Sequence, residues 1–198
     1  TTTEETTTTA SNDVTLPRNE TLYFAGLQWG AASSWNPLGV NQNNSLAIAG
    51  NASGYRTLMF ETLYMYNFMD GAVIPLLADG DYEWNADQTE MTVKIKPAAK
   101  WSDGTPVTAK DVAATYATCK KLGNSVGTTY GKYIETVEAV DDATLKIKCV
   151  TDEEGKPTNP LLVIDYLTGT PVVQAAWIET LTERNGGDST KMLNDKGE

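Results

Sequence analysis

The sequence predicts an α+β fold, a mixed α/β arrangement in which antiparallel hairpins pack against a helix. Two observations carry this prediction. Apolar and polar residues alternate in two pairs of segments, each pair joined by a short polar turn, as is typical of hairpins with one buried face. A capped helix is expected between the two pairs. The expected strands are 81–85, 89–96, 133–140 and 144–150, and the expected helix is 109–121.

The strand at 89–96 shows the alternation most clearly. Met91, Val93 and Ile95 are separated by Thr92 and by lysines, so one face of the strand is apolar and the other polar. The short turn 86–88 joins this strand to the one before it. The same reasoning gives the second hairpin its turn at 141–143.

The start of the helix is marked by turn and capping residues. Asp103 and Gly104 suit a turn, and Pro106 keeps the chain extended just before the helix. Thr108 is expected to be the N-cap, with Asp111 three residues later completing a capping box on the positive end of the helix.

Composition excludes several classes of function. The 198-residue chain carries a formal net charge of −11, which would repel a polyanion, so nucleic-acid binding is not expected. Histidine is absent. The common general base, the histidine-activated nucleophiles and the most frequent transition-metal ligand are therefore missing, and no cofactor is expected.

The two cysteines are read as core residues. Cys119 shares a helix face with Val112 and Tyr116, and Cys149 alternates with apolar residues on an expected strand. A helix lying on the sheet could bring the two thiols together in an oxidising compartment, so a disulfide and two buried thiols both stay open.

The remaining segments are less regular. Residues 1–17 are expected to form a disordered, Thr-rich tether, such as follows the removed leader of an exported protein. Residues 123–131 are read as a Gly-rich break, and 160–173 as mostly apolar chain. A further helix is expected over 174–184, followed by polar residues at 185–198 that fray or lead elsewhere.

Several runs together resemble one protein family in order and spacing. They are Val73-Ile-Pro-Leu-Leu-Ala-Asp-Gly-Asp-Tyr-Glu-Trp84, Met91-Thr-Val-Lys-Ile-Lys-Pro97, Lys100-Trp-Ser-Asp-Gly-Thr-Pro-Val-Thr-Ala-Lys-Asp-Val112 and Val140-Asp-Asp-Ala-Thr-Leu-Lys-Ile147. The chain is similar to the extracellular solute-binding proteins of ABC transporters, family 5. This group includes oligopeptide-, nickel- and cello-oligosaccharide-binding proteins. Trp101 belongs to the most specific run, and it and Asp103 are interpreted as fold residues rather than ligand contacts.

The resemblance implies a periplasmic-binding-protein-like fold (class II, family 5). Residues 18–198 would supply the N-terminal part of the first lobe, with 55–165 as its accessory subdomain, and the second lobe would be missing. The resemblance further implies a monomer that closes its two lobes on a small-molecule ligand and delivers it to an ABC permease. The expected location is the periplasm or the cell surface, with a lipid anchor upstream.

In this family, recognition falls on the end of the first strand and the nearby loops, which here is the segment 28–37. Its Gln28, Trp29, Trp35 and Asn36 combine flat aromatic surfaces with polar side chains, a combination that suits a sugar. The alternative is that one or both tryptophans pack against the lobe. Tyr64 and Tyr130 are further candidates. Tyr64, with Tyr66 two residues on, is equally typical of strand packing, and Tyr130 of a loop anchor.

Residues 21–55 carry no charged side chain, which favours a neutral ligand. Within the family this favours a cello-oligosaccharide or related β-linked oligosaccharide over a peptide, with nickel a more remote alternative.

No catalytic residue is expected. A glycoside hydrolase is weighed because 26 acidic residues make some carboxylate pair inevitable, but these residues cluster in solvated turns. An adhesive surface module and calcium binding at an acidic loop stay open as lesser alternatives.

Overall fold

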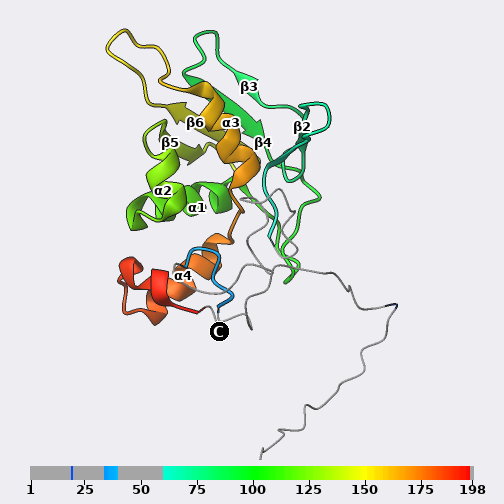
Figure 1. The fold of residues 1–198 in the computed structure, drawn as a ribbon. Helices are drawn as coiled ribbons and strands as arrows, with labels where there is room; N and C mark the ends of the chain where they lie inside the picture. The colour runs from blue at the N-terminus through cyan, green and yellow to red at the C-terminus, as the bar shows by residue number, and fades with distance from the viewer. Residues whose placement is uncertain (1–18, 20–33, 40–59, 197–198) are drawn as a thin grey trace, which may run out of the picture.

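The computed structural model describes residues 19, 34–39 and 60–196 (Figure 1). Within these ranges, four antiparallel strands form the main sheet, in the order β3-β4-β6-β5. The expected tether at 1–17 lies outside the described residues. The strands are β3 (Glu83–Trp84), β4 (Glu90–Lys94), β5 (Ile134–Ala139) and β6 (Thr144–Cys149).

Both predicted hairpins are confirmed. β3 pairs with β4, and β5 pairs with β6, while β4 and β6 join the two hairpins into one sheet. The register places Met91 of β4 opposite Ile147 of β6, and Val93 opposite Leu145. All four of these side chains are buried, so the alternation seen in the sequence sets which face of the sheet enters the core.

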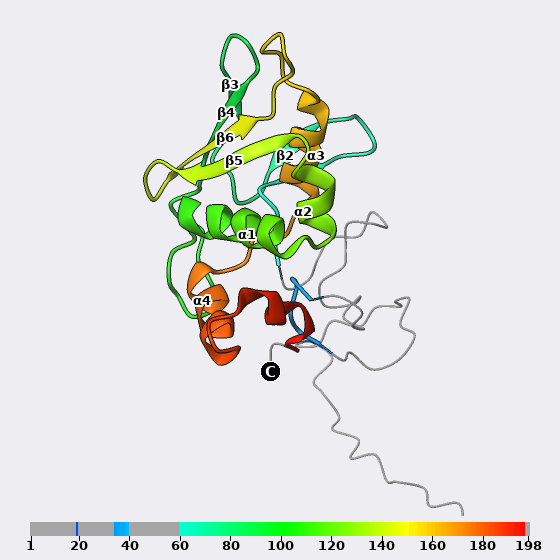
Figure 2. The ribbon, with the colours of Figure 1, turned by 90° about the vertical axis from the view of Figure 1, so that its left-hand side faces the viewer.

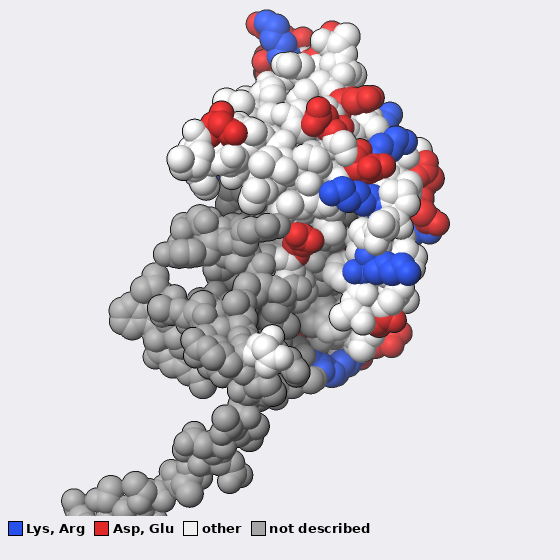
Figure 3. All heavy atoms as spheres, turned by 90° about the vertical axis from the view of Figure 1, so that its right-hand side faces the viewer, with Lys and Arg blue, Asp and Glu red and all other residues white. Residues whose placement is uncertain are grey.

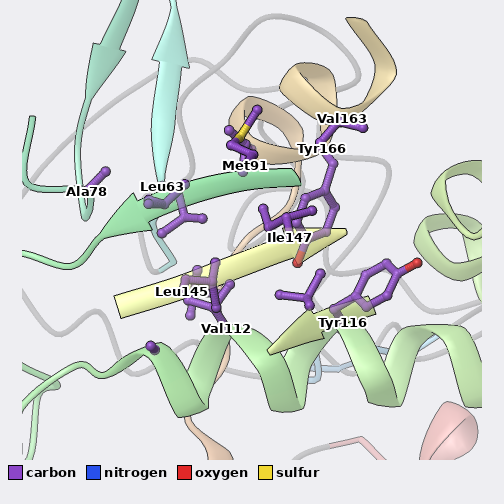
Figure 4. Close-up of a cluster of buried hydrophobic side chains, with 14 of the residues drawn as sticks. Leu63, Ala78, Met91, Val112, Tyr116, Leu145, Ile147, Val163 and Tyr166 are labelled. Carbon is purple, nitrogen blue, oxygen red and sulfur yellow. The ribbon is translucent and has the colours of Figure 1, made fainter. Parts of the chain in front are cut away.

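Helix α1 (Ala109–Leu122) packs under this face of the sheet and confirms the expected helix. Figure 4 shows Val112 and Tyr116 of α1 pointing toward Leu145 and Ile147 of β6. The Tyr116 hydroxyl donates a hydrogen bond to the Ile134 carbonyl, so its one polar atom is satisfied within the apolar core. Burying each such side chain contributes roughly 1.5–3 kcal/mol.

A second, two-stranded hairpin stands beside the sheet. It is formed by β1 (Tyr64–Tyr66) and β2 (Val73–Pro75), and its connecting loop leaves Phe68 79% and Met69 92% exposed. Helix α3 (Pro160–Gly169) packs against β1 and adds Val163 and Tyr166 to the core. We had expected mostly apolar chain at 160–173. The residues form a helix because Asn159 caps it through the Leu162 N–H and Pro160 occupies its first turn.

The Gly-rich break expected at 123–131 contains a short helix, α2 (Ser125–Tyr130). The Asn124 side chain accepts a hydrogen bond from the Gly127 N–H at 3.0 Å and so caps this helix. Gly127 lies against the end of α1, where a Cβ atom would stand 2.0 Å from the Cys119 carbonyl oxygen. The glycine therefore permits close helix packing here rather than breaking the helix.

A second apolar cluster forms around helix α4 (Ala175–Arg184) and the last described residues and reaches the end of α1 at Cys119. It includes α4, which confirms the helix expected at 174–184, and the 3-10 helix η2 (Ser189–Asn194). Figure 2 shows α1 between the sheet above it and α4 with η2 below. Residues 185–198 were expected to fray or lead elsewhere, yet residues 189–194 fold back onto α4 with Met192 fully buried. The cluster comprises Leu38, Cys119, Val173, Ile178, Leu181 and Met192.

The two cysteines are free, buried thiols. Cys149 belongs to the cluster under the sheet, whereas Cys119 belongs to the cluster around α4. Cys119 does share a helix face with Val112 and Tyr116, but it lies near the end of α1, where α2 and Leu38 cover it. The two thiols therefore serve different cores.

The capping box at the start of α1 is present, and its carboxylate does more than the sequence predicts. Asp111 accepts hydrogen bonds from the Thr108 N–H at 2.8 Å and from the Trp101 indole Nε1 at 3.3 Å. Its second oxygen accepts a hydrogen bond at 2.8 Å from the backbone N–H of Ala175, the first residue of α4. One buried carboxylate thus satisfies orphan N–H groups of two helices.

The turn before α1 supports the same junction. Gly104 has a φ of +86°, the left-handed conformation that favours glycine, and Pro106 bridges back to Lys100. Asp103 accepts hydrogen bonds from the Thr105 N–H at 2.8 Å and from the Gln174 side-chain amide at 2.9 Å. Hydrogen bonds from Thr105 and then Gln174 hold the pKa of the exposed Asp103 carboxyl below its usual value. Within the described residues, Trp101 and Asp103 make contacts that explain them as fold residues.

Replacing Asp111 with alanine is expected to lower the free energy of unfolding of the full-length protein by about 2–4 kcal/mol, because two helix N-termini lose their acceptor. Urea denaturation followed by circular dichroism measures this. Asp87, an exposed residue in the β3–β4 turn, supplies the control, and D87A should change the value by less than about 0.5 kcal/mol. Equal effects of the two substitutions would contradict the role given to Asp111.

Replacing Gly127 with alanine is expected to destabilise the protein by about 1–3 kcal/mol, because the added Cβ forces α2 away from α1. The midpoint of urea unfolding is the measurement. T129A, at an exposed position of the same short helix, should leave the midpoint nearly unchanged. A wild-type midpoint for G127A would show that the two helices are not packed this closely.

Candidate functional site

Part of the predicted recognition loop is described, as residues 34–39. The predicted contacts Gln28 and Trp29 lie outside the described residues. Trp35 is 45% exposed, and its backbone N–H donates a hydrogen bond to the Lys196 carbonyl at 2.8 Å. The backbone of this residue is thus fixed while much of its side chain faces solvent. Figure 2 shows this loop, in blue, lying beside η2, in red.

Asn36 holds the loop to the end of the described chain rather than facing outward. It is fully buried, and its side-chain Nδ2 donates hydrogen bonds to the carbonyls of Met192 at 2.7 Å and Asp195 at 2.8 Å. Its Oδ1 accepts from the Leu38 N–H at 2.9 Å. We had predicted a ligand contact here. The described structure shows the amide bonded to backbone groups on both sides, so it supports the loop, and a ligand contact at Asn36 stays a prediction.

Tyr64 is also placed in the core and not on a binding surface. Its side chain is fully buried, its hydroxyl donates to the Gly80 carbonyl at 3.0 Å, and its ring meets that of Tyr82 edge to face. Burial raises the pKa of the Tyr64 phenol well above its usual value. This burial fits the strand-packing alternative for Tyr64, and a ligand contact at this ring stays a prediction.

Tyr130 lies partly exposed at the end of α2 and links that helix to α3. Its hydroxyl donates a hydrogen bond to Asp165 Oδ2 at 2.8 Å, and its ring packs edge to face on Tyr166. Burial, and then the hydrogen bond to Asp165, raises the pKa of the Tyr130 phenol. These contacts fit the loop-anchor alternative, while the partial exposure leaves a rim contact as a prediction.

The described residues also form a small cavity that the sequence did not predict. It lies between the 37–39 loop, the junction of α1 with α2, and the extended segment that leads from α3 to α4. Its volume is about 50 Å³. It is lined by Pro37, Leu38, Gly39, Thr115, Cys119, Asn124, Ser125, Val126, Thr170, Pro171 and Val173.

Two polar residues of the cavity wall are fixed by internal hydrogen bonds. The Thr115 hydroxyl accepts from the Val173 N–H at 2.9 Å and lies 2.8 Å from the Asp111 carbonyl, so it ties the extended segment to α1. Asn124 uses its amide oxygen on Gly127, and its Nδ2 donates to Cys119 Sγ at 3.4 Å. Burial raises the pKa of the Cys119 thiol to about 11, so the sulfur is a neutral thiol at physiological pH.

The cavity lining carries no charged side chain. On the face that Figure 3 shows, basic and acidic side chains are interspersed along one edge.

Among the described residues, no group of three His, Cys, Asp or Glu side chains could hold a metal ion. No helix in the described ranges is long and apolar enough to cross a membrane.

The chain belongs to the family described as bacterial extracellular solute-binding proteins, family 5 Middle, which matches residues 72–192. The matched span runs from β2 to η2 and includes the turn and capping box around Asp111. The expected fold class is confirmed, since the described mixed α/β structure matches those of family 5 binding proteins.

Solved structures give the same result. The chain is 27% identical, with a TM-score of 0.67 over 93% of its length, to a mannohexaose-bound oligopeptide ABC transporter, periplasmic oligopeptide-binding protein, from Thermotoga maritima. An oligopeptide-binding protein, AppA, from Bacillus subtilis, in complex with a nonapeptide, shares the fold at 19% identity and a TM-score of 0.57 over 84% of this chain. The chain spans 30% and 29% of these two proteins.

A curated relative covers a shorter stretch. The peptidoglycan-binding protein YepA of Agrobacterium fabrum is 32% identical over 69 residues, which is 35% of this chain and 11% of YepA. The chain therefore corresponds to a minor part of the length of each of these proteins.

Replacing Asn36 with aspartate is expected to lower the free energy of unfolding by about 2–4 kcal/mol, because a carboxylate cannot donate to the two carbonyls that the amide holds. Thermal unfolding of the full-length protein measures the loss. N194D makes the same chemical change at an exposed position of η2 and should have little effect. If N36D were as stable as wild type but bound its ligand less tightly, Asn36 would be a ligand contact after all.

Proposed function

We propose that this chain forms part of the first lobe of a solute-binding protein that captures a neutral oligosaccharide and delivers it to an ABC permease. Ligand would favour a closed state through contacts that are available when both lobes meet it. In this assignment residues 18–198 contribute to the first lobe, with 55–165 as an accessory subdomain, and the protein acts outside the cytoplasm on a lipid anchor.

The observation that carries the proposal is the match to a relative bound to mannohexaose, taken with the chemistry of the recognition segment. Residues 21–55 contain no fixed charge, and the described cavity beside the 37–39 loop is uncharged too. A neutral sugar needs hydroxyl partners and flat apolar surfaces rather than counter-charges. Both the relative and the residues therefore support a sugar.

Trp35 is the described residue best placed to contact such a ligand. Its backbone is held by Lys196 and its neighbour Asn36 is buried, so the loop presents the indole on a fixed support. A preorganised aromatic surface loses little conformational entropy when a sugar ring stacks on it. We assign Trp35, together with Gln28 and Trp29, to the ligand-contacting set, with Tyr130 as a rim contact.

An oligopeptide is the second candidate. It is favoured by the relatives, because the Thermotoga protein is described as an oligopeptide-binding protein and AppA is bound to a nonapeptide. A peptide can be held largely through backbone hydrogen bonds, but its charged termini need partners of opposite charge. Since residues 21–55 carry none, those partners would have to come from elsewhere in the protein.

Isothermal titration calorimetry on the full-length protein separates these functions. Mannohexaose, cellopentaose and a mixed pentapeptide serve as probes, and the sugar samples are checked afterwards for cleavage. Heat with intact sugar supports the proposal, and heat with the peptide alone supports the second candidate. Cleaved sugar would indicate a glycoside hydrolase, and silence with all three probes would contradict both binding functions.

Replacing Trp29 and Trp35 together with alanine is expected to abolish sugar binding, a loss of at least about 100-fold, without unfolding the full-length protein. Calorimetry and thermal unfolding measure the two effects. F68A removes another solvent-exposed aromatic ring, which lies on the β1–β2 loop, and this variant should bind normally. Unchanged affinity in the double variant would defeat this site assignment.

A further inference from the structure

We propose that Arg184 and Asp195 are positioning residues for the recognition segment, and that sugar affinity depends on the ion pair between their side chains. Arg184 is the last residue of α4, and Asp195 follows η2. This inference rests on the proposed function, because it takes Trp35 as a ligand contact. Neither residue of the pair needs to touch the ligand, since both act through the backbone that holds Trp35.

Two backbone carbonyls after η2 hold the recognition segment. The Lys196 carbonyl accepts a hydrogen bond from the Trp35 N–H, and the Asp195 carbonyl accepts one from the Asn36 side chain, each at 2.8 Å. Asp195 is the C-cap of η2 and has an extended backbone, so helical hydrogen bonding does not extend to Lys196. The place of Trp35 therefore depends on how the chain after η2 is fixed.

The Asp195 side chain fixes this part of the chain to the end of α4. Arg184 Nε donates a hydrogen bond to Asp195 Oδ2 at 3.0 Å, and Arg184 Nη2 donates one to Oδ1. The Asn185 side-chain Nδ2 also donates to Oδ2, at 2.7 Å. A bidentate pair of arginine and carboxylate sets direction as well as distance. The Asp195 side chain is 9% exposed, so water screens the pair little on this side.

The sign of the charge indicates that the carboxylate does not serve α4 itself. The C-terminus of a helix carries partial negative charge, which favours a cation such as Arg184 there and disfavours a carboxylate. Asp195 is held at this end by Arg184 and Asn185 although the helix dipole opposes it. Its contribution is therefore to fix the chain after η2, which carries the recognition segment.

The ion pair matters for binding because a fixed contact residue binds more tightly than a mobile one. Ordering a loop when the ligand arrives costs free energy, whereas a preorganised loop has already lost that freedom on folding. Without the ion pair, Trp35 is still present but its backbone support is loose. Sugar binding then weakens even though every predicted ligand contact remains in the protein.

The test compares variants of the full-length protein by calorimetry with mannohexaose and cellopentaose, and thermal unfolding checks that each variant folds. R184M removes the guanidinium and keeps an unbranched side chain, and we expect about a tenfold loss of affinity for the sugar that binds. D195N keeps the size of the side chain and should lose a similar amount. The double variant should be no weaker than the weaker single variant, because the two residues act as one pair.

K191M is the matched control. Lys191 is another cation of the same region, in η2, and its Nζ lies 4.0 Å from Asp188 Oδ2 in an exposed pair. The substitution removes the same charge as R184M but leaves the contacts of Asp195 in place. This variant should bind sugar like wild type.

Fluorine spectra separate the positioning of Trp35 from a general structural effect. The full-length protein is labelled with 5-fluorotryptophan, and the Trp35 resonance is assigned by its absence from W35F. R184M and D195N should shift or broaden this resonance in the absence of ligand. The resonances of Trp84 and Trp101 should stay unchanged, because both side chains pack against the cluster under the sheet.

The outcomes distinguish this inference from the proposed function. If R184M and D195N bind sugar like wild type while the variant lacking Trp29 and Trp35 does not, the positioning role is wrong and the proposed function stands. An unchanged Trp35 resonance in both variants, or an equal loss of affinity in K191M, also overturns the positioning role. Failure of the wild-type protein to bind either sugar would overturn the proposed function, and the link to sugar affinity with it.

Discussion

The arrangement of the whole described structure depends on the Asp111 carboxylate. The sheet with α1 and the unit of α4 with η2 have separate apolar clusters, and a shared carboxylate joins the beginnings of α1 and α4. An anionic side chain at two helix N-termini is favoured electrostatically at both. The hydrogen bonds of Trp101 to this carboxylate and of Asp103 to Gln174 hold the same junction from the turn.

Because of this junction, α1 packs against both apolar clusters and also lines the cavity. Val112 and Tyr116 pack against the sheet, while Thr115 and Cys119 line the cavity together with the extended segment and the 37–39 loop. The Thr115 hydroxyl fixes the segment by bonding Val173, and Gly127 lets α2 close the remaining side. The cavity thus results from how three distant parts of the chain meet, not from any local motif.

The fold was largely predictable and the site was not, for a physical reason. Alternation and capping are local, so the two hairpins, α1 and α4 follow from residues a few positions apart. Helix α3 was missed although Asn159 and Pro160 signal its start, because a short apolar run does not show a helical period. Helix α2 and η2 depend on contacts that sequence patterns do not reveal. Asn36 bonds to Met192, which is 156 residues away.

The same distinction explains why two predicted site residues, Asn36 and Tyr64, lie buried in the described structure. Asn36 and Tyr64 have the right chemistry for a sugar contact, but residue type does not say which way a side chain points. The family resemblance predicted a recognition segment at 28–37, and among its described residues the structure buries Asn36 and leaves Trp35 partly exposed.

The two edge strands of the main sheet are poorly suited to pairing with a strand of another molecule. β3 has two residues, and β5 has an irregular register between Ile134 and Thr136 together with Glu135 and Glu138 along its length. Short, irregular or charged borders make poor templates for a strand from another molecule. Within the described chain, both edges of the sheet are therefore protected against the intermolecular strand pairing that begins amyloid growth. This protection is useful for a protein that, at its proposed location, works without the chaperones of the cytoplasm.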